Sequence, residues 1–308
     1  MLARPEQLLL ALICEAAIGY PALVLATIGH PVMWIGAAIA ALDRGWNTGS
    51  AMRRRAMGLA LLVMVAGSVG AIGWLIEVWA QDGLAVLLII AVTTTGLAQR
   101  SLDDHVRAVA RPLLRGDLVA ARGAVARIVG RDAAELDEHG VAVAATESLA
   151  ESFCDGVVAP VFWFLVAGLP GLLICKAVNT ADSMIGHRDA RYLHFGWAAA
   201  RTDDVVNFIP ARISGVFLCL AGMGGWGTML RDARHHASPN GGWPEAAMAG
   251  VLGRRLGGPV TYDGEPAHRA WLGEGPAPSA TDLQRALWVY RRACLLMWVG
   301  MGAIAWLL

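Results

Sequence analysis

The chain has 308 residues, of which 56% are hydrophobic and 16% charged, and its formal net charge is zero. A soluble domain usually carries about 25% charged residues, so the composition argues against a soluble protein and indicates one that lies in membrane lipid. The balanced charge excludes the strongly basic composition that is typical of many nucleic-acid-binding proteins. We therefore expect no nucleic-acid partner.

Long apolar segments alternate with polar blocks along the chain, and a helix needs about 20 apolar residues to cross a bilayer. The apolar segments are 8–42, 56–80, 83–99, 156–178, 205–226 and 285–308, and the polar blocks are 100–151, 179–204 and 231–285. We expect an all-α, polytopic integral membrane protein with cytoplasmic helical and loop blocks. It is predicted to form a single membrane domain over residues 1–308.

Prolines and polar residues interrupt the apolar segments near the N-terminus. Pro21 and Pro31 interrupt segment 8–42, and proline breaks or kinks a helix. This segment is therefore predicted to be one span with a short half-helix, or a tilted pair. The next two segments are separated only by the polar residues Gln81 and Asp82, which predicts a helical hairpin across the membrane.

Segment 156–178 contains Pro160 and Pro170 and is predicted to be broken or re-entrant. Such a segment is tolerated at membrane depth only where it is buried in protein or lines a cavity. The arginines at 53–55 and throughout the first polar block indicate a cytoplasmic location. A re-entrant segment, which we favour, keeps the next block (179–204) in the cytoplasm as well, whereas a full crossing places it outside.

An acidic stripe precedes the proline-broken segment. Glu147, Glu151 and Asp155 follow each other at intervals of four residues, which places them on one face of a helix. Like charges at this spacing repel, so the stripe indicates either a solvated face or a bound cation. Its position beside the broken segment favours a Mg²⁺ site, because Mg²⁺ uses one or two carboxylates together with substrate phosphates.

The stretch ARTDDVVNFIPAR places charge directly before an apolar segment. Asp203 and Asp204 are followed by Asn207, and Arg201 and Arg212 flank the group. If the apolar segment is helical from its first residue, Asp203 and Asn207 share a face. Helix capping and the helix dipole explain one aspartate at a helix N-terminus. They do not explain the whole set, which predicts a metal–phosphate site.

Lys176 is the only lysine in the chain and lies in the apolar stretch LLICKAVNTADS. Ionisable residues in such positions are usually functional, and a compact ammonium suits a phosphate oxygen. The polar block that follows mixes acidic, amide and basic residues, which suits a metal–phosphate site or, as the alternative, a surface salt-bridge network. Its candidate residues are Asn179, Asp182, Ser183, Arg188 and Arg191.

Other motifs are weak or absent. His235 and His236 have no third ligand at a spacing typical of a metal site, and we expect them to be solvated. The chain has no GxxxxGK[ST] motif, which excludes a P-loop. It also has no GxSxG or HExxH motif.

Several long stretches together resemble one known family. They include ATESLAESFCDGVVAPVFW, KAVNTADSMIGHRDARYLHFGWAAARTDDVVNFIPAR and SPNGGWPEAAMAGVLGRRLGGPVTYDG. In this order they are similar to blocks of the CobD/CbiB family of cobalamin biosynthesis, the membrane-bound adenosylcobinamide-phosphate synthases. Ser152 stands where the family usually has Asn, and Tyr20 replaces an acidic residue of the family's usual Gly-Asp-Pro.

The resemblance implies a reaction and its participants. ATP and Mg²⁺ support amide formation between adenosylcobyric acid, a cobalt-carrying corrinoid, and (R)-1-aminopropan-2-ol O-phosphate. The product is adenosylcobinamide phosphate. The resemblance also implies a multi-pass protein of the cell inner (cytoplasmic) membrane with its active site on the cytoplasmic side, working beside other late enzymes of cobalamin biosynthesis. The alternative is a non-catalytic membrane sensor or a transporter that shares the fold.

The candidate residues fall into three groups under this hypothesis. The catalytic group is Lys176, Asp182, Arg201, Asp203, Asp204 and Asn207, and the group for substrate and phosphate is Asn179, Ser183, Arg188, Arg191 and Arg212. The metal group is Glu147, Glu151, Asp155, Asp203 and Asp204. A carboxylate or His194 is the candidate base for the incoming amine.

Overall fold

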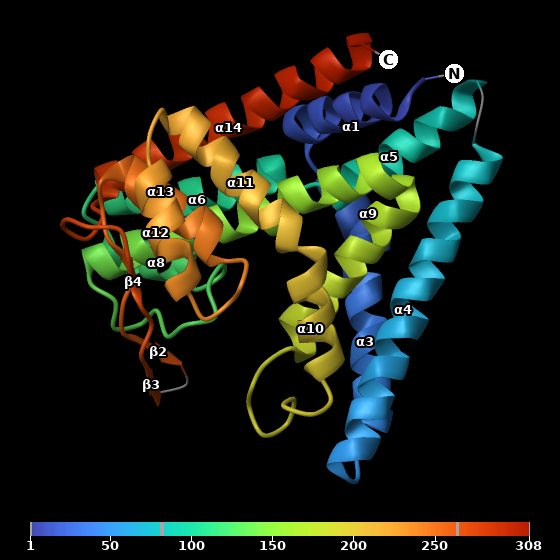
Figure 1. Ribbon diagram of the computed structural model, residues 1–308, viewed down its shortest axis with the longest axis horizontal. Coiled ribbons are helices and arrows are strands. Elements are labelled where there is room, and N and C mark those ends of the chain that lie inside the picture. Colours follow the sequence, from blue (N-terminus) through green and yellow to red (C-terminus); the bar gives the residue numbers. More distant parts are fainter. Residues whose placement is uncertain (1, 81–82, 263–264, 308) are drawn as a thin grey trace. The chain divides into compact units, whose positions relative to one another are not determined.

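The computed structural model describes residues 2–80, 83–262 and 265–307 and is built almost entirely of helices (Figure 1). The all-α class expected from the sequence is confirmed. The chain divides into two compact units, each made of segments that lie far apart in the sequence. Unit 1 comprises Met1–Ala98, Ala159–Asn207 and Met301–Leu308, and unit 2 comprises Gln99–Val158 and Phe208–Gly300. The single membrane domain expected from the sequence stays a prediction.

Unit 1 contains the N-terminal helices and the middle of the chain. Its helices are α1 (Arg4–Ile18), α2 (Ala22–Ile28), α3 (Pro31–Trp46), α4 (Ala51–Trp79), η1 (Gly83–Ala85), α5 (Val86–Gly96), α9 (Ala159–Ile185) and α10 (Trp197–Val206). The expected breaks near the N-terminus are confirmed. Gly19 and Gly29 end α1 and α2 with positive φ angles of 66° and 74°, and Pro31 occupies the first position of α3, where its missing N–H is harmless.

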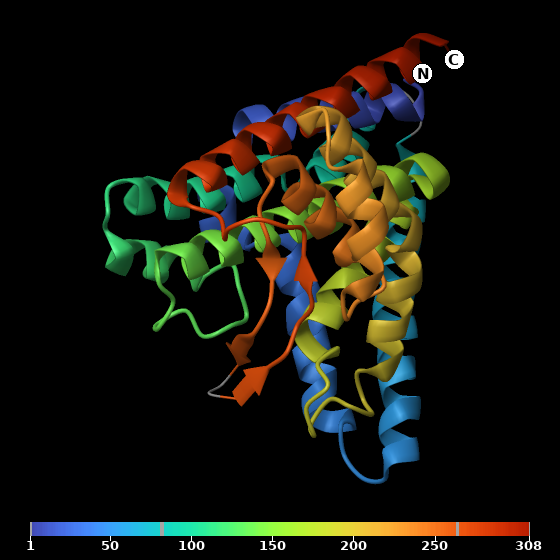
Figure 2. The ribbon, with the colours of Figure 1, turned by 60° about the vertical axis from the view of Figure 1, so that its left-hand side comes forward.

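Unit 2 contains further helices and short strands. Its helices are α6 (Gln99–Leu114), α7 (Leu118–Val125), α8 (Glu138–Phe153), the π-helix η2 (Cys154–Val158), α11 (Phe208–Gly222), α12 (Trp226–Asp232), η3 (Ala233–His235), α13 (Gly242–Leu252) and most of α14 (Ala280–Leu307). Its strands are β1 (Leu256–Gly257), β2 (Val260–Tyr262), β3 (Glu265–Ala267) and β4 (Trp271–Leu272). β1 pairs antiparallel with β4, and β2 with β3 (Figure 2).

Within the described residues, four helical stretches are long and apolar enough to cross a membrane: Ala22–Trp46, Ala51–Trp79, Gly83–Leu114 and Glu138–Ile185. The bent pair α10–α11 adds a fifth if its two helices form one span. The chain is therefore a polytopic helical membrane protein. α14 is not among these four, so the span expected at 285–308 stays a prediction. The predicted hairpin turn at Gln81–Asp82 lies outside the described residues.

The predicted break in segment 156–178 is present in α9. It lies at Ala167 and Gly168, where Gly168 has a positive φ of 66°, and the chain changes direction sharply there (Figure 1). The Glu77 carboxylate from α4 accepts a hydrogen bond from Leu169 N at 2.8 Å and so caps the second half of α9. Pro170 lies in the first turn after the break, where its missing N–H is tolerated.

Pro160 does not break the segment as expected. It lies in the first turn of α9, directly after the π-helix η2. Proline cannot donate to the carbonyl four residues before it, and its ring clashes with that carbonyl. The wider π turn relieves both conflicts, since a π-helix displaces the i→i−4 pattern. Whether the segment is re-entrant in a bilayer stays a prediction.

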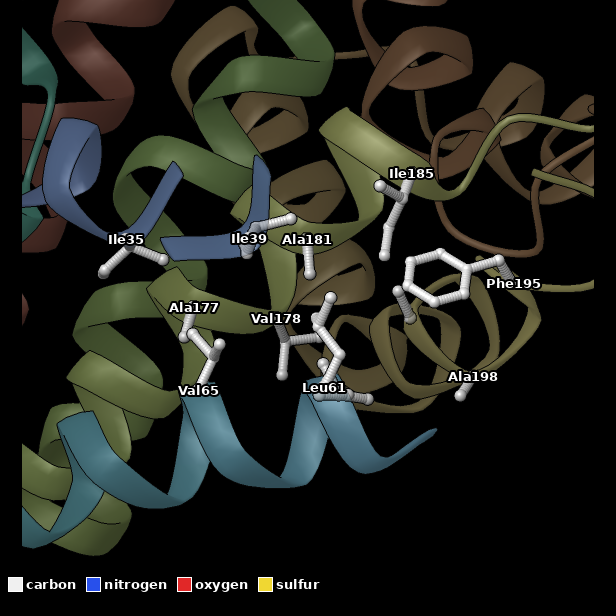
Figure 3. Packing of buried hydrophobic residues seen from close by; sticks show 12 residues of the cluster. Ile35, Ile39, Leu61, Val65, Ala177, Val178, Ala181, Ile185, Phe195 and Ala198 are labelled. Atoms are coloured by element: carbon white, nitrogen blue, oxygen red, sulfur yellow. The ribbon is translucent and has the colours of Figure 1, made fainter. Parts of the chain in front are cut away.

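The apolar core of unit 1 joins α3, α4, α9 and α10. Ile39, Leu61, Val178, Ile185 and Phe195 are its large buried members (Figure 3). The interface between α4 and α9 also uses glycines, as closely packed membrane helices do. A Cβ on Gly73 of α4 would lie 3.0 Å from Pro170 Cα, so α4 approaches the broken part of α9 closely only because residue 73 has no side chain.

The start of α14 is tied to the rest of unit 2 by a capping box. Ser279 N and Oγ donate to Asp282 Oδ2 at 3.0 and 2.7 Å, and Asp282 N donates back to Ser279 Oγ at 3.3 Å. Arg254 Nε donates to the same carboxylate at 2.8 Å. Burial acts to raise the pKa of Asp282, but the hydrogen bonds from Arg254 and Ser279 outweigh burial and lower this pKa to about 2.

Two glycines of α4 provide a matched test of the α4–α9 packing. Gly73→Ala should reduce the free energy of unfolding in detergent by about 1–3 kcal/mol, because the added methyl overpacks the interface. Gly67→Ala should leave it unchanged or raise it by up to about 1 kcal/mol, because a Cβ on Gly67 meets nothing within 4 Å. Equal effects of the two substitutions would contradict the close packing.

Asp282→Asn should lower the free energy of unfolding at neutral pH by about 2 kcal/mol, since each pKa unit corresponds to about 1.4 kcal/mol. The pKa of Asp282 is lowered by folding, so its stabilisation is present above the unfolded value of 3.8 and is lost as the pH falls towards about 2. The stabilities of the native protein and of Asp282→Asn, measured by thermal unfolding, should therefore converge as the pH falls through this range. A constant difference would contradict the assignment.

Candidate functional site

Helices α9 and α10 of unit 1 bring five predicted site residues together, which we call the acid–amide cluster: Asn179, Asp182, Asp203, Asp204 and Asn207. The Asp203 carboxylate is at its centre. Both of its oxygens accept a hydrogen bond from Asn207 Nδ2 at 3.0 Å, and Asn179 donates another. The carboxylates of Asp182 and Asp204 lie within electrostatic range of Asp203. Residues separated by up to 28 positions in the sequence therefore form one constellation.

The helix that carries Asp203 and Asp204 is not the one expected. They lie in the last turn of α10, Asn207 is its C-cap, and α11 begins only at Phe208. The prediction of an N-terminal cap is therefore wrong, because α10 begins at Trp197. Acidic side chains at a helix C-terminus face the unfavourable end of the helix dipole, so capping explains neither aspartate. The predicted shared face of Asp203 and Asn207 is confirmed by their hydrogen bonds.

Asn207 is 2% exposed and has an unsatisfied acceptor. Its Nδ2 donates to a carboxylate, which fixes the orientation of the amide group, since only the nitrogen donates. Its Oδ1 is buried and has no hydrogen-bond partner among the described residues. An unpaired buried polar atom destabilises a fold by about 1–3 kcal/mol, so this oxygen is a candidate contact for a bound ligand.

Two cationic candidates lie on the helices of the cluster. Arg201 is mostly exposed and lies 3.5 Å from Asp204 Oδ2. Lys176 is half-buried on α9, one turn before Asn179, and lies close enough to His30 for the two side chains to interact electrostatically. This arrangement places one exposed and one partly buried cation on the helices that hold the carboxylates.

The remaining candidates of unit 1 lie at or after the end of α9, where Ser183 and Arg188 are exposed. Arg191 Nη2 donates to Asp43 Oδ2 at 2.6 Å, and Tyr192 donates to the same oxygen at 3.3 Å. The Asp43 carboxylate holds the pKa of Arg191 above its ordinary value. Arg191 therefore forms a salt bridge, as the alternative prediction from the sequence had it. The predicted role of Arg191 in phosphate binding stays a prediction.

Glu147 lies in a second group, within unit 2, which we call the charged network: Arg131, Glu147, His236, Glu245 and Arg269. Glu147 pairs with Arg131 and, at 3.2 Å, with Arg269, and its other oxygen accepts from Gly257 N at 2.5 Å. Arg269 also pairs with Glu245 at 3.2 Å and contacts His236 Nε2 at 3.2 Å. Two arginines therefore supply positive charge beside Glu147, the first residue of the acidic stripe.

Burial controls the protonation of the charged network. Burial raises the pKa of Glu245 well above its ordinary value, and the nearby carboxylates of Glu147 and Glu151 raise it further, against the opposing charge of Arg269. Burial also lowers the pKa of His236, and Arg269 adds to that effect. Burial therefore opposes the charged forms of Glu245 and His236, and the opposing charge of Arg269 favours the charged form of Glu245.

The sequence missed most of this network. The expectation that His236 is solvated is wrong, because its side chain is 11% exposed and lies 3.6 Å from Glu245, whereas His235 is exposed as expected. Glu245 carries a recognisable signal, a carboxylate within the apolar stretch of α13. Arg131 and Arg269 lie in ordinary polar stretches and carry none.

The other unit 2 candidates are Arg212, Glu151 and Asp155, and they lie on three different helical elements. Arg212 Nη1 donates to Asn240 Oδ1 at 3.0 Å, and its guanidinium lies 3.6 Å from the Phe208 ring centroid and 4.7 Å from that of Trp243. Glu151 is exposed near the end of α8. Asp155 lies in η2, whose wider turn moves it off the regular four-residue stripe.

No group of three or more His, Cys, Asp and Glu side chains is arranged to hold a metal ion in the part of the chain that the structure describes. The predicted ligands also divide between the units, with Asp203 and Asp204 in unit 1 and Glu147, Glu151 and Asp155 in unit 2. Mg²⁺ often uses only one or two carboxylates together with substrate phosphates. The predicted magnesium site therefore stays a prediction.

The comparisons with known proteins decide the family. The family model described as "CobD/Cbib protein" matches residues 8–290. The chain belongs to the CobD/CbiB family. No solved structure matches it.

Three curated relatives of this CobD/CbiB chain carry the name cobalamin biosynthesis protein CobD. The relative from Rhodobacter capsulatus is 50% identical over 299 residues, 95% of each chain. That from Rhizobium meliloti is 42% identical, covering 97% of this chain and 96% of its own. That from Brucella suis is 45% identical, covering 90% and 87%. The likeness extends over nearly the whole chain.

Arg269→Ala should destabilise the protein by about 3–5 kcal/mol, because it removes a cationic partner from two buried carboxylates, Glu147 and Glu245. Thermal unfolding in detergent measures the effect. Arg234→Ala, at an exposed position in the same unit, is the matched control and should change stability by less than about 0.5 kcal/mol. A similar stability for both variants would show that the charged network is dispensable.

Proposed function

We propose that this protein is an adenosylcobinamide-phosphate synthase of cobalamin biosynthesis. The reaction joins the carboxylate of adenosylcobyric acid to the amine of (R)-1-aminopropan-2-ol O-phosphate in an ATP-dependent amide bond. Membership of the CobD/CbiB family and the names of the relatives support a role in cobalamin biosynthesis. The specific reaction is the one that the family resemblance implies, and it accounts for the chemistry of the acid–amide cluster.

The observation that carries the proposal is the gathering of Asn179, Asp182, Asp203 and Asn207 from two helices around one carboxylate. A mere surface network needs no buried amide with an unsatisfied oxygen, because water would satisfy it. The cluster presents hard oxygen donors, with Lys176 and Arg201 on the same helices. This donor set suits the polyphosphate chemistry of an ATP-dependent ligase.

Mg²⁺ fits the donor chemistry of the cluster, since it binds oxygen ligands and takes one or two carboxylates with substrate phosphates. Asp204 and Asp182 would hold the ion. When bound, it neutralises developing charge on the phosphates of ATP. Arg201, which reaches Asp204 from an exposed position, and Lys176 would bind phosphate oxygens.

The proposed chemistry activates the carboxylate before the amine attacks. Phosphoryl transfer from ATP converts the propionate into an acyl phosphate and releases ADP. The substrate ammonium loses a proton to a base, and the amine then forms the C–N bond as the C–O bond to phosphate breaks and inorganic phosphate leaves. Most of what the protein supplies in such steps is positioning and charge stabilisation. A packed core sets the relative placement of α9 and α10. Side chains on these two helices can therefore supply both positioning and charge stabilisation.

We also propose that the active site faces the cytoplasm from the cell inner membrane. ATP is cytoplasmic, and the arginines at 53–55 lie at the start of α4, as the positive-inside rule requires of a cytoplasmic helix end. Labelling of the exposed Arg188 loop in sealed inverted vesicles should succeed without permeabilisation. Labelling only after permeabilisation would refute this orientation.

Asp182→Asn and Asp203→Asn should each lower kcat/KM for amide formation by about a hundredfold or more, because each removes charge from the group that orients the reactants. The assay uses purified protein with ATP, Mg²⁺, adenosylcobyric acid and the amino-alcohol phosphate. Both variants should still insert into membranes. Glu274→Gln, at an exposed carboxylate, is the control and should remain fully active. Near-normal turnover by both aspartate variants would refute the assignment of the cluster.

A further inference from the structure

The amide oxygen of Asn207 is the most specific clue to a ligand in the acid–amide cluster. Its residue is 2% exposed, its Oδ1 finds no partner among the described residues, and its Nδ2 is committed to both oxygens of Asp203 at 3.0 Å. The two groups of the amide cannot exchange places, because a turned amide would set its oxygen against a carboxylate. The unused acceptor is therefore held in one place beside a carboxylate.

The charge around this acceptor selects the kind of group that binds it. Asp203 lies within electrostatic range of Asp182 and Asp204, and Arg201 lies 3.5 Å from Asp204 Oδ2. An acceptor in such surroundings favours a ligand that is cationic and carries N–H donors. A carboxylate or a phosphate would be repelled.

The reactants of the proposed function contain one group of this kind. The reacting group of the corrinoid is a carboxylate, and ATP presents phosphates. Only the amino-alcohol phosphate carries a primary ammonium, which offers three N–H donors and one positive charge. We infer that Asn207 Oδ1 and the Asp203 carboxylate form the subsite for the ammonium group of the amino-alcohol phosphate. This inference rests on the proposed function and deepens it.

The assignment divides the two adjacent aspartates between different tasks. Asp203, hydrogen-bonded by Asn179 and Asn207, binds the amine end of the substrate. Asp204, paired with Arg201, remains with the phosphates. The Asn207–Asp203 pair also gives the site a means to select a primary amine over a hydroxyl. A site built to bind a charged donor discriminates strongly against an analogue that lacks it.

A comparison of two ligands tests the inference without requiring turnover. The ligands are (R)-1-aminopropan-2-ol O-phosphate and propane-1,2-diol 2-phosphate, in which a hydroxyl replaces the amine. Calorimetry on the full-length protein in detergent should give about ten- to hundredfold tighter binding of the amine by the native protein, as a hydrogen bond to a charged group implies. Asn207→Ala should reduce this preference to about threefold or less and leave the affinity for the diol phosphate unchanged.

Control variants separate the subsite from folding. Thr180→Val removes a hydroxyl on α9 that is bonded within its own helix and should keep the full preference for the amine. Asn207→Ser, which is smaller yet polar, replaces Asn207→Ala if the alanine variant does not fold, and should also lose the preference. Equal loss of both ligands in the Asn207 variants, or a preference that stays intact, would overturn the inference.

A titration with Mg²⁺ tests the alternative that Asn207 Oδ1 binds a metal ion and not the ammonium group. If Asn207→Ala raises the half-saturating Mg²⁺ concentration for ATP binding about tenfold and leaves the amine preference intact, the oxygen belongs to a metal and the inference falls. The proposed function fails on a different result, namely absence of product from the native protein with all reactants present. An amine preference that depends on Asn207 would still establish the subsite in that case.

Discussion

The hydrogen bond from Leu169 N to the Glu77 carboxylate is the interaction on which the arrangement of unit 1 depends. A helix broken within an apolar segment exposes backbone N–H groups, and lipid cannot satisfy them. Glu77 meets this need at 2.8 Å, and Gly168 makes room for its carboxylate. The break redirects the second half of α9, which carries Lys176, Asn179 and Asp182. The position of the break in α9 therefore determines where these candidate site residues lie.

The two units handle buried charge in different ways. In unit 2, Glu147 and Glu245 are matched by Arg131 and Arg269, so the network is largely self-sufficient and holds separate elements of that unit together. In unit 1, Asp203 is held by neutral amides, which satisfy its hydrogen bonds without cancelling its charge. An acidic group prepared in this way is ready for a cationic ligand. This contrast is consistent with a structural role for the charged network and with the functional role proposed for the acid–amide cluster.

Family membership and geometry support the function in complementary ways. The CobD/CbiB family match covers residues 8–290 and supports a role in cobalamin biosynthesis, but it assigns no task to any side chain. The cluster on α9 and α10 suggests where carboxylate activation and amine binding take place, because it combines fixed acids, fixed amides and one open acceptor. Positioning of this kind is the main contribution that a protein makes to amide formation through an acyl phosphate.

The sequence by itself determined the membrane class, the breaks near Pro21 and Pro31, and most members of the acid–amide cluster, because hydropathy and misplaced charge are local signals. It misjudged which end of a helix carries Asp203, since neither Asn207 nor Phe208 marks the boundary between α10 and α11. Only the tertiary structure decided that arginines neutralise Glu147, that His236 is buried, and that Asn207 keeps an open oxygen. These properties depend on partners distant in the sequence, and their distance and burial exist only after the helices have packed.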